Sequence, residues 1–224
     1  MTNKPTIAII GGTGALGSGL ILRWAGAGYP VIIGSRSRDK AVEAADGLRA
    51  DNPSWTVRGD DNLGAAREAD IAVLTVPFSN HDATLEELKE ALSGKIVVDA
   101  VVPLVPPKVS VVQLPAEGSA AQIAQRKLGD TVRVVSAFHN VGAAKLQGGE
   151  PIECDVLVSG DDKEARDTVI ALAAAIGMRG IDAGALANSV AAEALTSILI
   201  GINRRYKVDC AGIRITGIAP QTPA

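Results

Sequence analysis

Short apolar runs rich in β-branched residues alternate along the chain with longer stretches in which apolar positions recur at helical spacing. The pattern predicts strands at 6–10, 29–34, 55–58, 71–76, 95–100, 133–137 and 155–159. It predicts helices at 15–27, 39–50, 63–68, 84–92, 119–127 and 162–176. Continuous apolar strands such as 71–76 are typical of a parallel sheet that helices cover on both faces. We therefore expect an α/β fold with a doubly wound, mainly parallel sheet.

The last long apolar stretch, 186–206, carries almost no charge apart from Glu193 and the pair Arg204 and Arg205 near its end. This composition predicts a helix that is buried on most of its sides, packed against the main domain or against a partner subunit. Glu193 is then either a solvent-facing residue or a subunit contact, and the sequence does not choose between these. We expect one large domain over residues 1–150 and a smaller C-terminal extension, residues 151–224, that contains this buried helix.

A glycine-rich turn follows the first predicted strand and opens the first helix. Gly12, Gly14 and Gly17 match the spacing G-x-G-x-x-G. At these positions glycine allows a tight turn, a close approach of the backbone to a pyrophosphate, and close packing of the helix on the strand. The N-terminus of the helix then faces the phosphates. Because the motif lies between a strand and a helix, it predicts a dinucleotide site in a Rossmann-type domain rather than a purely structural turn.

The end of the second predicted strand indicates which dinucleotide binds. NAD sites usually place Asp or Glu there to hold the ribose 2′-hydroxyl. This chain has Ser35, Arg36 and Arg38 instead, with Lys40 just beyond. A hydroxyl and several cations suit a 2′-phosphate, and a guanidinium can bind phosphate in a bidentate manner, so Arg36 is the best-placed candidate. We predict NADP rather than NAD; the alternative is a solvated loop whose charges only keep it soluble.

The composition excludes several kinds of site. Among 224 residues there are only two His and two Cys, and Cys154 and Cys210 have no metal-binding spacing, so we expect no metal site and two buried, reduced thiols. With 22 Lys and Arg against 25 Asp and Glu, and few aromatic residues, we expect no nucleic-acid partner. The sequence shows no signal-peptide pattern and no apolar stretch that approaches membrane-spanning length, so we expect no membrane association and a cytoplasmic location.

Few residues are available for acid–base chemistry beside a nicotinamide. Alcohol dehydrogenases often use a Tyr with a Lys four residues on, but neither Tyr29 nor Tyr206 has that partner. His139 directly follows a predicted strand, at the carboxyl end where ligands bind in such sheets. His81 lies in a predicted loop, where Asp82 could orient it. Each His therefore either touches a ligand or has only a surface or capping role.

Several segments resemble, in the same order, the reduced coenzyme F420:NADP oxidoreductases, also called NADPH-dependent F420 reductases. The matching segments are 9–17, 33–36, 74–77, 102–104, 118–121, 135–139, 182–186, 203–207 and 212–215. The resemblance spans nearly the whole chain, and its later segments are more specific than the glycine motif. It implies a soluble oxidoreductase that passes a hydride directly between NADP(H) and the deazaflavin coenzyme F420, and a homodimer formed through the C-terminal helix.

The resemblance also implies roles for individual residues, with residues 1–150 binding NADP and residues 151–224 serving F420 binding and dimerisation. The pyrophosphate would bind at Gly12, Thr13, Gly14, Ala15 and Leu16, and the 2′-phosphate at Ser35, Arg36 and Lys40. The nicotinamide would lie beside Val76, Pro77, Asn80 and Val102, closed by Ala143. The deazaflavin would contact His139, Val141 and Ala211, and His139, the one catalytic candidate, would orient or polarise its ring.

One segment departs from the family pattern. Members often carry an aromatic residue, an acidic residue and then a His after the Val-Pro step, whereas this chain has Phe78-Ser79-Asn80-His81. The His is displaced by one position, which leaves its role open. Two other functions remain as alternatives: an NADPH-dependent flavin or small-carbonyl reductase, and a non-catalytic NADP-binding sensor.

Overall fold

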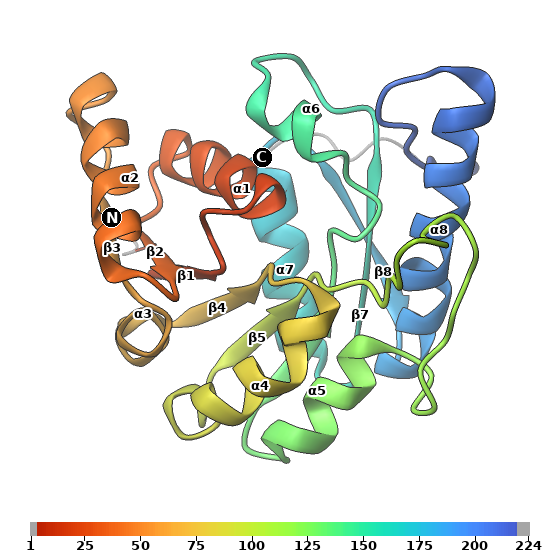
Figure 1. The fold of residues 1–224 in the computed structure, drawn as a ribbon, viewed down its shortest axis with the longest axis horizontal. Coiled ribbons are helices and arrows are strands. Elements are labelled where there is room, and N and C mark those ends of the chain that lie inside the picture. The colour runs from red at the N-terminus through yellow and green to blue at the C-terminus, as the bar shows by residue number, and fades with distance from the viewer. Residues whose placement is uncertain (1–3, 219–224) are drawn as a thin grey trace.

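Residues 4–218, which the computed structural model describes, form one eight-stranded sheet with helices on both faces (Figure 1). The strands are β1 (Ile7–Ile10), β2 (Val31–Ser35), β3 (Val57–Asp61), β4 (Ile71–Leu74), β5 (Ile96–Asp99), β6 (Arg133–Ser136), β7 (Asp155–Gly160) and β8 (Arg179–Gly184). Their order across the sheet is β3-β2-β1-β4-β5-β6-β7-β8. Every neighbouring pair is parallel except β6 and β7, which are antiparallel. The predicted doubly wound, mainly parallel sheet is confirmed.

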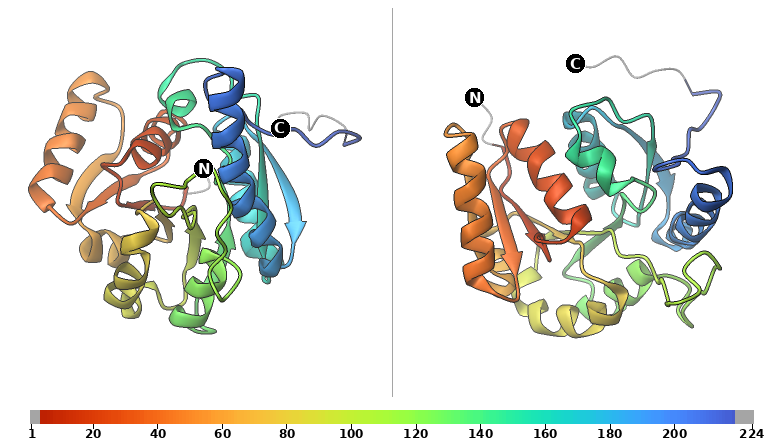
Figure 2. Two further views of the ribbon diagram at one scale, coloured as in Figure 1. Left: turned by 45° about the vertical axis from the view of Figure 1, so that its right-hand side comes forward. Right: turned by 45° about the horizontal axis from the view of Figure 1, so that its top comes forward.

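The helices cover the sheet in two layers, which Figure 2 shows from two further directions. They are α1 (Ala15–Gly26), α2 (Arg38–Asp51), α3 (Asn62–Glu68), α4 (Phe78–Leu88), α5 (Ala120–Leu128), α6 (Ala143–Gln147), α7 (Lys163–Ala175) and α8 (Ser189–Tyr206), with short 3₁₀ turns η1 (Glu90–Leu92) and η2 (Leu186–Asn188). One core contains α1 and α7 side chains such as Leu20 and Val169. The other contains Ala65, Leu85 and Ala124 from α3, α4 and α5.

Two elements were absent from the sequence-based prediction. The edge strand β8 lies parallel to β7 but contains little apolar sequence, and its Arg179 pairs with Asp155 of β7 at 2.6 Å. The five-residue helix α6 is held by α1: Arg23 donates hydrogen bonds to the carbonyl oxygens of Lys145 and Leu146 at its end. Both elements depend on partners far along the chain, which local periodicity does not reveal.

The predicted boundaries are close in the remaining elements, with two informative shifts. The helix expected from residue 84 begins at Phe78, directly after Pro77, so His81 lies on α4 and not in a loop. Strand β3 begins at Val57 and ends at Asp61, later than the predicted 55–58. Both shifts move residues that face the candidate site described below.

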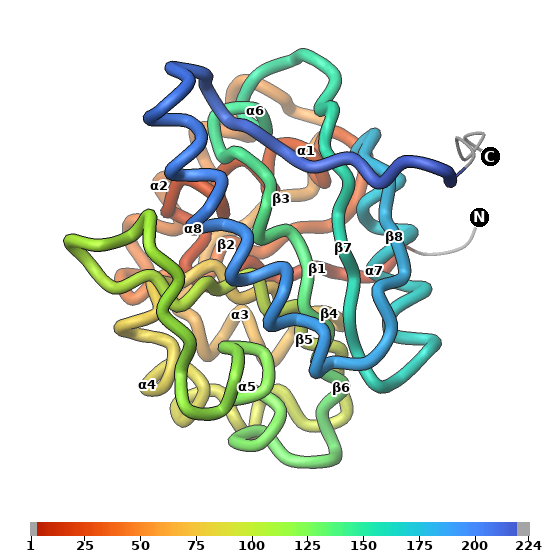
Figure 3. Tube along the Cα trace, turned by 90° about the vertical axis from the view of Figure 1, so that its right-hand side faces the viewer, coloured from red at the N-terminus to blue at the C-terminus, as the bar shows by residue number. Residues whose placement is uncertain are grey.

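The C-terminal helix is present, but it is not buried on most of its sides in this chain. About 33% of its apolar 18-residue stretch is buried, and Ile198 is 49% exposed. By length and composition the stretch Leu186–Tyr206 could cross a membrane, so the expectation that no apolar stretch approaches that length is wrong. Figure 3 shows α8 beside the segment that links β5 to α5, where Gly201 approaches Ser110. One face of α8 thus packs on the domain, as in a core helix.

Glu193 is neither solvent-facing nor a subunit contact in the structure. Glu193 is 1% exposed and lies on the inner face of α8. The carboxyl group accepts hydrogen bonds from the backbone N–H groups of Ala120 at 2.7 Å and Ala121 at 3.1 Å. These are the first residues of α5, where N–H groups have no partner within the helix. Glu193 therefore caps α5 from α8, which corrects the sequence-based interpretation.

Candidate functional site

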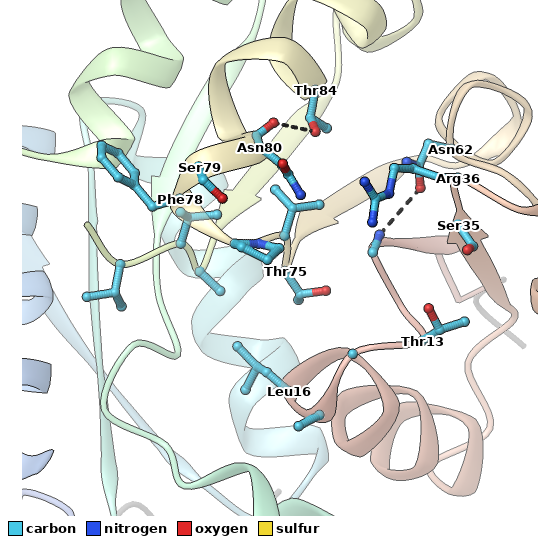
Figure 4. Close-up of a pocket in the computed structure, with 18 of the residues that line it drawn as sticks. Thr13, Leu16, Ser35, Arg36, Asn62, Thr75, Phe78, Ser79, Asn80 and Thr84 are labelled. Atoms are coloured by element: carbon cyan, nitrogen blue, oxygen red, sulfur yellow. Dashed lines mark hydrogen bonds between the residues drawn. The ribbon is translucent and has the colours of Figure 1, made fainter. Parts of the chain in front are cut away.

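A cleft with a volume of about 750 Å³ lies at the carboxyl ends of β1, β2, β4 and β5 (Figure 4). Strands β2 and β4 flank β1 on opposite sides, so the chain reverses its direction of winding at this point. Open α/β sheets bind their ligands at such a switch point. The glycine turn and the start of α1 form one side of the cleft, and the start of α4 forms another.

The glycine turn has the geometry that close packing of strand and helix requires. A Cβ atom on Gly17 would lie 2.8 Å from both the Gly12 Cα and the Thr75 Oγ1, and one on Gly12 would lie 2.9 Å from the Ile9 carbonyl oxygen. Among the glycines of this turn, only Gly11 has a positive φ, at +76°, and Gly11 is not part of the motif. The turn and packing therefore need glycine at 11, 12 and 17, whereas Gly14 meets only the Gly11 carbonyl oxygen, at 3.3 Å.

The start of α1 is open to an anion. Gly14 is the N-cap of α1 and its first turn has no side-chain cap. Thr13, Gly14, Ala15 and Leu16 line the cleft beside it. Unpaired N–H groups and the positive end of the helix dipole favour a phosphate at this position. Four of the predicted pyrophosphate residues thus line one end of the cleft, whereas Gly12 is not among the lining residues.

The cationic end of the cleft lies at the carboxyl end of β2. Ser35, Arg36 and Lys40 line the cleft together with Ser37, whose Oγ accepts a hydrogen bond from the Lys40 N–H as the N-cap of α2. Arg38 is turned elsewhere: its Nε lies 3.1 Å from Asp60 Oδ1. No Asp or Glu is among the residues that line the cleft in the described part of the chain. The charge at this end is therefore suited to a phosphate.

Asn62 is a cleft residue that the sequence reasoning missed. It is buried at the start of α3, and its Oδ1 accepts a hydrogen bond from the Gly11 N–H at 3.4 Å, so that it supports the glycine turn (Figure 4). The signal that could have found it is its place directly after a strand, since polar residues at carboxyl ends of strands face the site. The predicted strand ended at 58, three residues before β3 does, and this hid it.

Apolar side chains form the far end of the cleft. Val76, Pro77, Asn80 and Val102, the residues predicted beside the nicotinamide, are among those that line it, and Figure 4 shows Phe78, Ser79 and Asn80 at the start of α4 on the same side. Val101 and Leu104 line the other wall, after β5. Ala143, predicted to close this end, begins α6 and is not among the lining residues. The arrangement suits a flat ring with few charged neighbours.

The three residues of the predicted deazaflavin side lie outside this cleft. Val141 is packed in the core, and the Ala211 N–H donates to Asn203 Oδ1 at 2.8 Å. His139 is 6% exposed, and both of its ring nitrogens are buried with no hydrogen-bond partner among residues 4–218. Burial lowers the pKa of His139 to about 4, although the Asp99 carboxyl group opposes the shift.

Helix α8 holds the turn that carries His139. Phe138 has a φ of 68°, and its ring meets Trp24 edge-on at 5.5 Å. Thr196 Oγ1 donates to the His139 carbonyl oxygen at 3.0 Å, and Asn140 Nδ2 donates to the Ala192 carbonyl oxygen at 2.9 Å. The C-terminal helix thereby fixes the backbone after β6.

His81 is oriented by a different carboxyl group from the one predicted. Its Nε2 lies 2.8 Å from Asp99 Oδ2, and both side chains are buried. Asp82 is exposed and pairs with Lys127 at 2.7 Å. The prediction that Asp82 orients His81 is therefore wrong.

The two cysteines are not among the residues that line the cleft. Both cysteines are free; Cys154 is buried, and burial raises the pKa of its thiol. Cys210 is only half-buried, which corrects the expectation of two buried thiols. In the part of the chain from residue 4 to residue 218, no group of three or more His, Cys, Asp or Glu side chains could hold a metal ion. The chemistry at the cleft therefore depends on the residues described above.

Comparison with known proteins gives consistent matches. The family model described as "NADP oxidoreductase coenzyme F420-dependent" matches residues 6–103. An F420-dependent NADP reductase of Methanocaldococcus jannaschii is 43% identical over 95% of this chain and 98% of its own. One of Methanothermobacter marburgensis is 44% identical over the same shares. A crystal structure of an Arthrobacter protein, described as a candidate F420-dependent NADP reductase, has a TM-score of 0.78 and 25% identity, covering 95% of this chain and 99% of the other.

Proposed function

Because this chain belongs to the family of coenzyme F420-dependent NADP oxidoreductases, we propose that it is an enzyme that transfers a hydride between NADP(H) and the deazaflavin coenzyme F420. The observation that carries this conclusion is a similarity over almost the whole chain to two reductases of that name. The cleft at the switch point supports it, because its glycines and cations suit a phosphorylated dinucleotide.

NADP would lie along the cleft. Its pyrophosphate would bind at Gly12–Leu16, where Gly17 holds α1 close, and its 2′-phosphate at Ser35, Arg36 and Lys40. Arg38, which pairs with Asp60, would contribute only its more distant charge. The nicotinamide would lie between Val76, Pro77 and Asn80 on one wall and Val102 on the other, near Ala143.

The deazaflavin would contact the side of the molecule that carries His139, Val141 and Ala211. When both coenzymes are bound, their rings supply the hydride donor and acceptor. The chain holds the two rings in contact and keeps water away with apolar walls, which is the proximity contribution to the rate. With a pKa near 4, His139 is neutral at pH 7, so it would orient the deazaflavin through a hydrogen bond and not through a positive charge.

Two copies of the chain would associate through α8. Ile198 is 49% exposed on its outer face, and the neighbouring segment after β5 exposes Val111 and Leu114 by more than half. Exposed apolar side chains that lie together are typical of an interface between subunits. A homodimer that functions in the cytoplasm is the assembly and location we propose.

A substrate panel tests the proposed function. The purified protein is mixed with NADPH and, in separate reactions, with F420, FMN and a set of small carbonyl compounds. We expect loss of F420 absorbance with equimolar oxidation of NADPH. Oxidation of NADPH with FMN or a carbonyl compound alone would instead support the alternative reductase, and binding of NADPH without oxidation would support a sensor. The similarity to named F420-dependent reductases does not favour either alternative.

A further inference from the structure

The two walls at the apolar end of the cleft are joined by a buried pair of side chains. His81 lies on α4, and its Nε2 is 2.8 Å from Oδ2 of Asp99, the last residue of β5. The imidazole is 1% exposed and the Asp99 side chain is 0% exposed. A hydrogen bond in such a dry environment is strong, and the loss of one partner leaves a buried polar group unsatisfied.

Each member of the pair is in contact with a residue that lines the cleft. Asp99 Oδ1 accepts a hydrogen bond from the Val101 N–H at 3.0 Å, and Val101 lines the wall after β5. The His81 ring stacks on Phe78 with a centroid distance of 6.2 Å and an angle of 27°, and Phe78 lines the wall at the start of α4. The chain of contacts Val101–Asp99–His81–Phe78 therefore runs behind the cleft from one wall to the other.

We propose that His81 and Asp99 are a positioning pair that sets the separation of these two walls and thereby the alignment of the nicotinamide ring for hydride transfer. The proposal rests on the proposed function, since it assigns the pair to the nicotinamide end of that site. Neither residue lines the cleft, so the pair acts through Phe78 and Val101. Misplacement of a reacting ring by about 1 Å can cost about a hundredfold in rate.

The position of His81 on α4 distinguishes this positioning role from a general contribution to stability. The C-terminal half of α4 is anchored in the core by Leu85 and Leu88, which are buried. His81 lies in the first turn, next to the cleft residues Ser79 and Asn80. Two other titratable side chains interact electrostatically with Asp99: His139, in the turn after β6, and Glu193, on α8. Both lie on other elements than α4, whereas His81 links Asp99 to the wall at the start of α4 through its hydrogen bond.

The experiment compares His81→Phe and Asp99→Asn with a matched control, Asp82→Asn, at the exposed carboxylate next to His81. Phenylalanine keeps the stack on Phe78 but removes the hydrogen bond to Asp99. Asparagine keeps the size of the side chain and the acceptor for Val101, but it replaces the carboxylate oxygen that faces His81 Nε2 with an N–H donor. His81→Gln, which can donate again from Nε2, is the rescue variant. Fluorescence lifetime and anisotropy of NADPH at saturation report how firmly the nicotinamide is held, without F420. The dissociation constant of NADPH and the kcat with F420 are also measured for each variant.

We expect lower nicotinamide anisotropy and at least about a tenfold lower kcat in His81→Phe and Asp99→Asn, with the NADPH dissociation constant within roughly threefold of the wild type. His81→Gln should recover part of both losses, and Asp82→Asn should match the wild type. Unchanged anisotropy and kcat in folded variants would overturn the proposal, and so would parallel losses of affinity, kcat and Tm. If the wild type does not reduce F420 but its nicotinamide fluorescence depends on His81, the proposed function fails while the positioning role stands.

Discussion

Arg36, His81 and Glu193 differ in how far along the chain their surroundings lie. Arg36 lines the cleft directly after strand β2 of the nucleotide-binding unit. His81 and Glu193 have partners that are distant in sequence: Asp99 lies 18 residues from His81, and the start of α5 lies 73 residues from Glu193. A carboxylate in an apolar helix can face solvent or a buried helix end, and only the packing of the two helices decides.

Arg36 offers the most direct residue-scale prediction. Arg36→Ala should weaken NADPH binding by about 1.5–3 kcal/mol, because a charge-assisted contact to the 2′-phosphate is lost. NADH, which lacks that phosphate, should bind almost as before. Titration calorimetry with both nucleotides measures the difference. Arg38→Ala is the comparison variant, since its guanidinium already pairs with Asp60; equal losses for NADPH and NADH in Arg36→Ala would refute the assignment.

Glu193 predicts a dependence of stability on pH. Burial raises its pKa from 4.5 to about 8, so the folded protein favours the protonated form. The stabilisation that this proton provides is complete below the ordinary pKa of 4.5. It is lost as the pH rises through about 8, the pKa of Glu193 in the folded protein. Between about pH 5 and pH 8.5, the free energy of unfolding should therefore fall less in Glu193→Gln than in the wild type. Urea unfolding at each pH measures this, with Glu87→Gln, at an exposed carboxylate, as the control; equal slopes in all three proteins would show that Glu193 is not protonated in the fold.

At the scale of elements, strong local patterns were predicted well and weak ones were not. Strands β1 and β4 are continuous apolar runs buried in the sheet, β5 is apolar up to its last residue, Asp99, and the sequence is sufficient to place all three. Strand β8 has no such run, since it is an edge strand held by the Arg179–Asp155 pair and by its ladder to β7. The glycine turn was found by its motif, but the residue with the left-handed backbone, Gly11, lies just outside that motif.

The packing of α1 on the glycine turn makes a prediction about Gly17. In Gly17→Ala, the added methyl group would lie 2.8 Å from Gly12 Cα and Thr75 Oγ1, so α1 must move away from the sheet. We expect a loss of about 1–3 kcal/mol in the free energy of unfolding and weaker NADPH binding. Gly47→Ala is the control because nothing lies within 4 Å of the added atom on α2, and it should gain roughly 0.5–1 kcal/mol. Thermal unfolding compares the two, and equal stability would contradict the packing argument.

For the whole molecule, the sequence predicted the class of fold and the place of the nucleotide cleft, since both follow from the order of strands and helices. It did not predict that α8 leaves an apolar face uncovered, because composition alone does not separate burial in the domain from burial by a partner. The side of the molecule that carries His139 depends on this helix, which holds the turn after β6 through Thr196. One element thus carries both the contact to the turn with His139 and the apolar face that the proposed dimer would use.

The exposed face of α8 predicts the state of association. Ile198→Glu should shift the protein from dimer to monomer, because a charge would have to be buried in an apolar interface. Sedimentation velocity over a range of concentrations measures the change. Val42→Glu, at an exposed apolar residue on α2 near the other edge of the sheet, should leave the dimer intact. A wild type that is monomeric at all concentrations would exclude the proposed interface.

A deuterium label on NADPH shows whether the hydride passes directly from the nicotinamide ring to the deazaflavin ring. NADPH that carries deuterium at C4, in the two stereochemical forms separately, is oxidised by the protein in ordinary water with F420 as acceptor, and the reduced F420 is analysed by mass spectrometry. Direct ring-to-ring transfer predicts that one of the two forms delivers its deuterium to F420 without loss to solvent. Reduced F420 that contains no deuterium from either form, or no reduction of F420 at all, would contradict it.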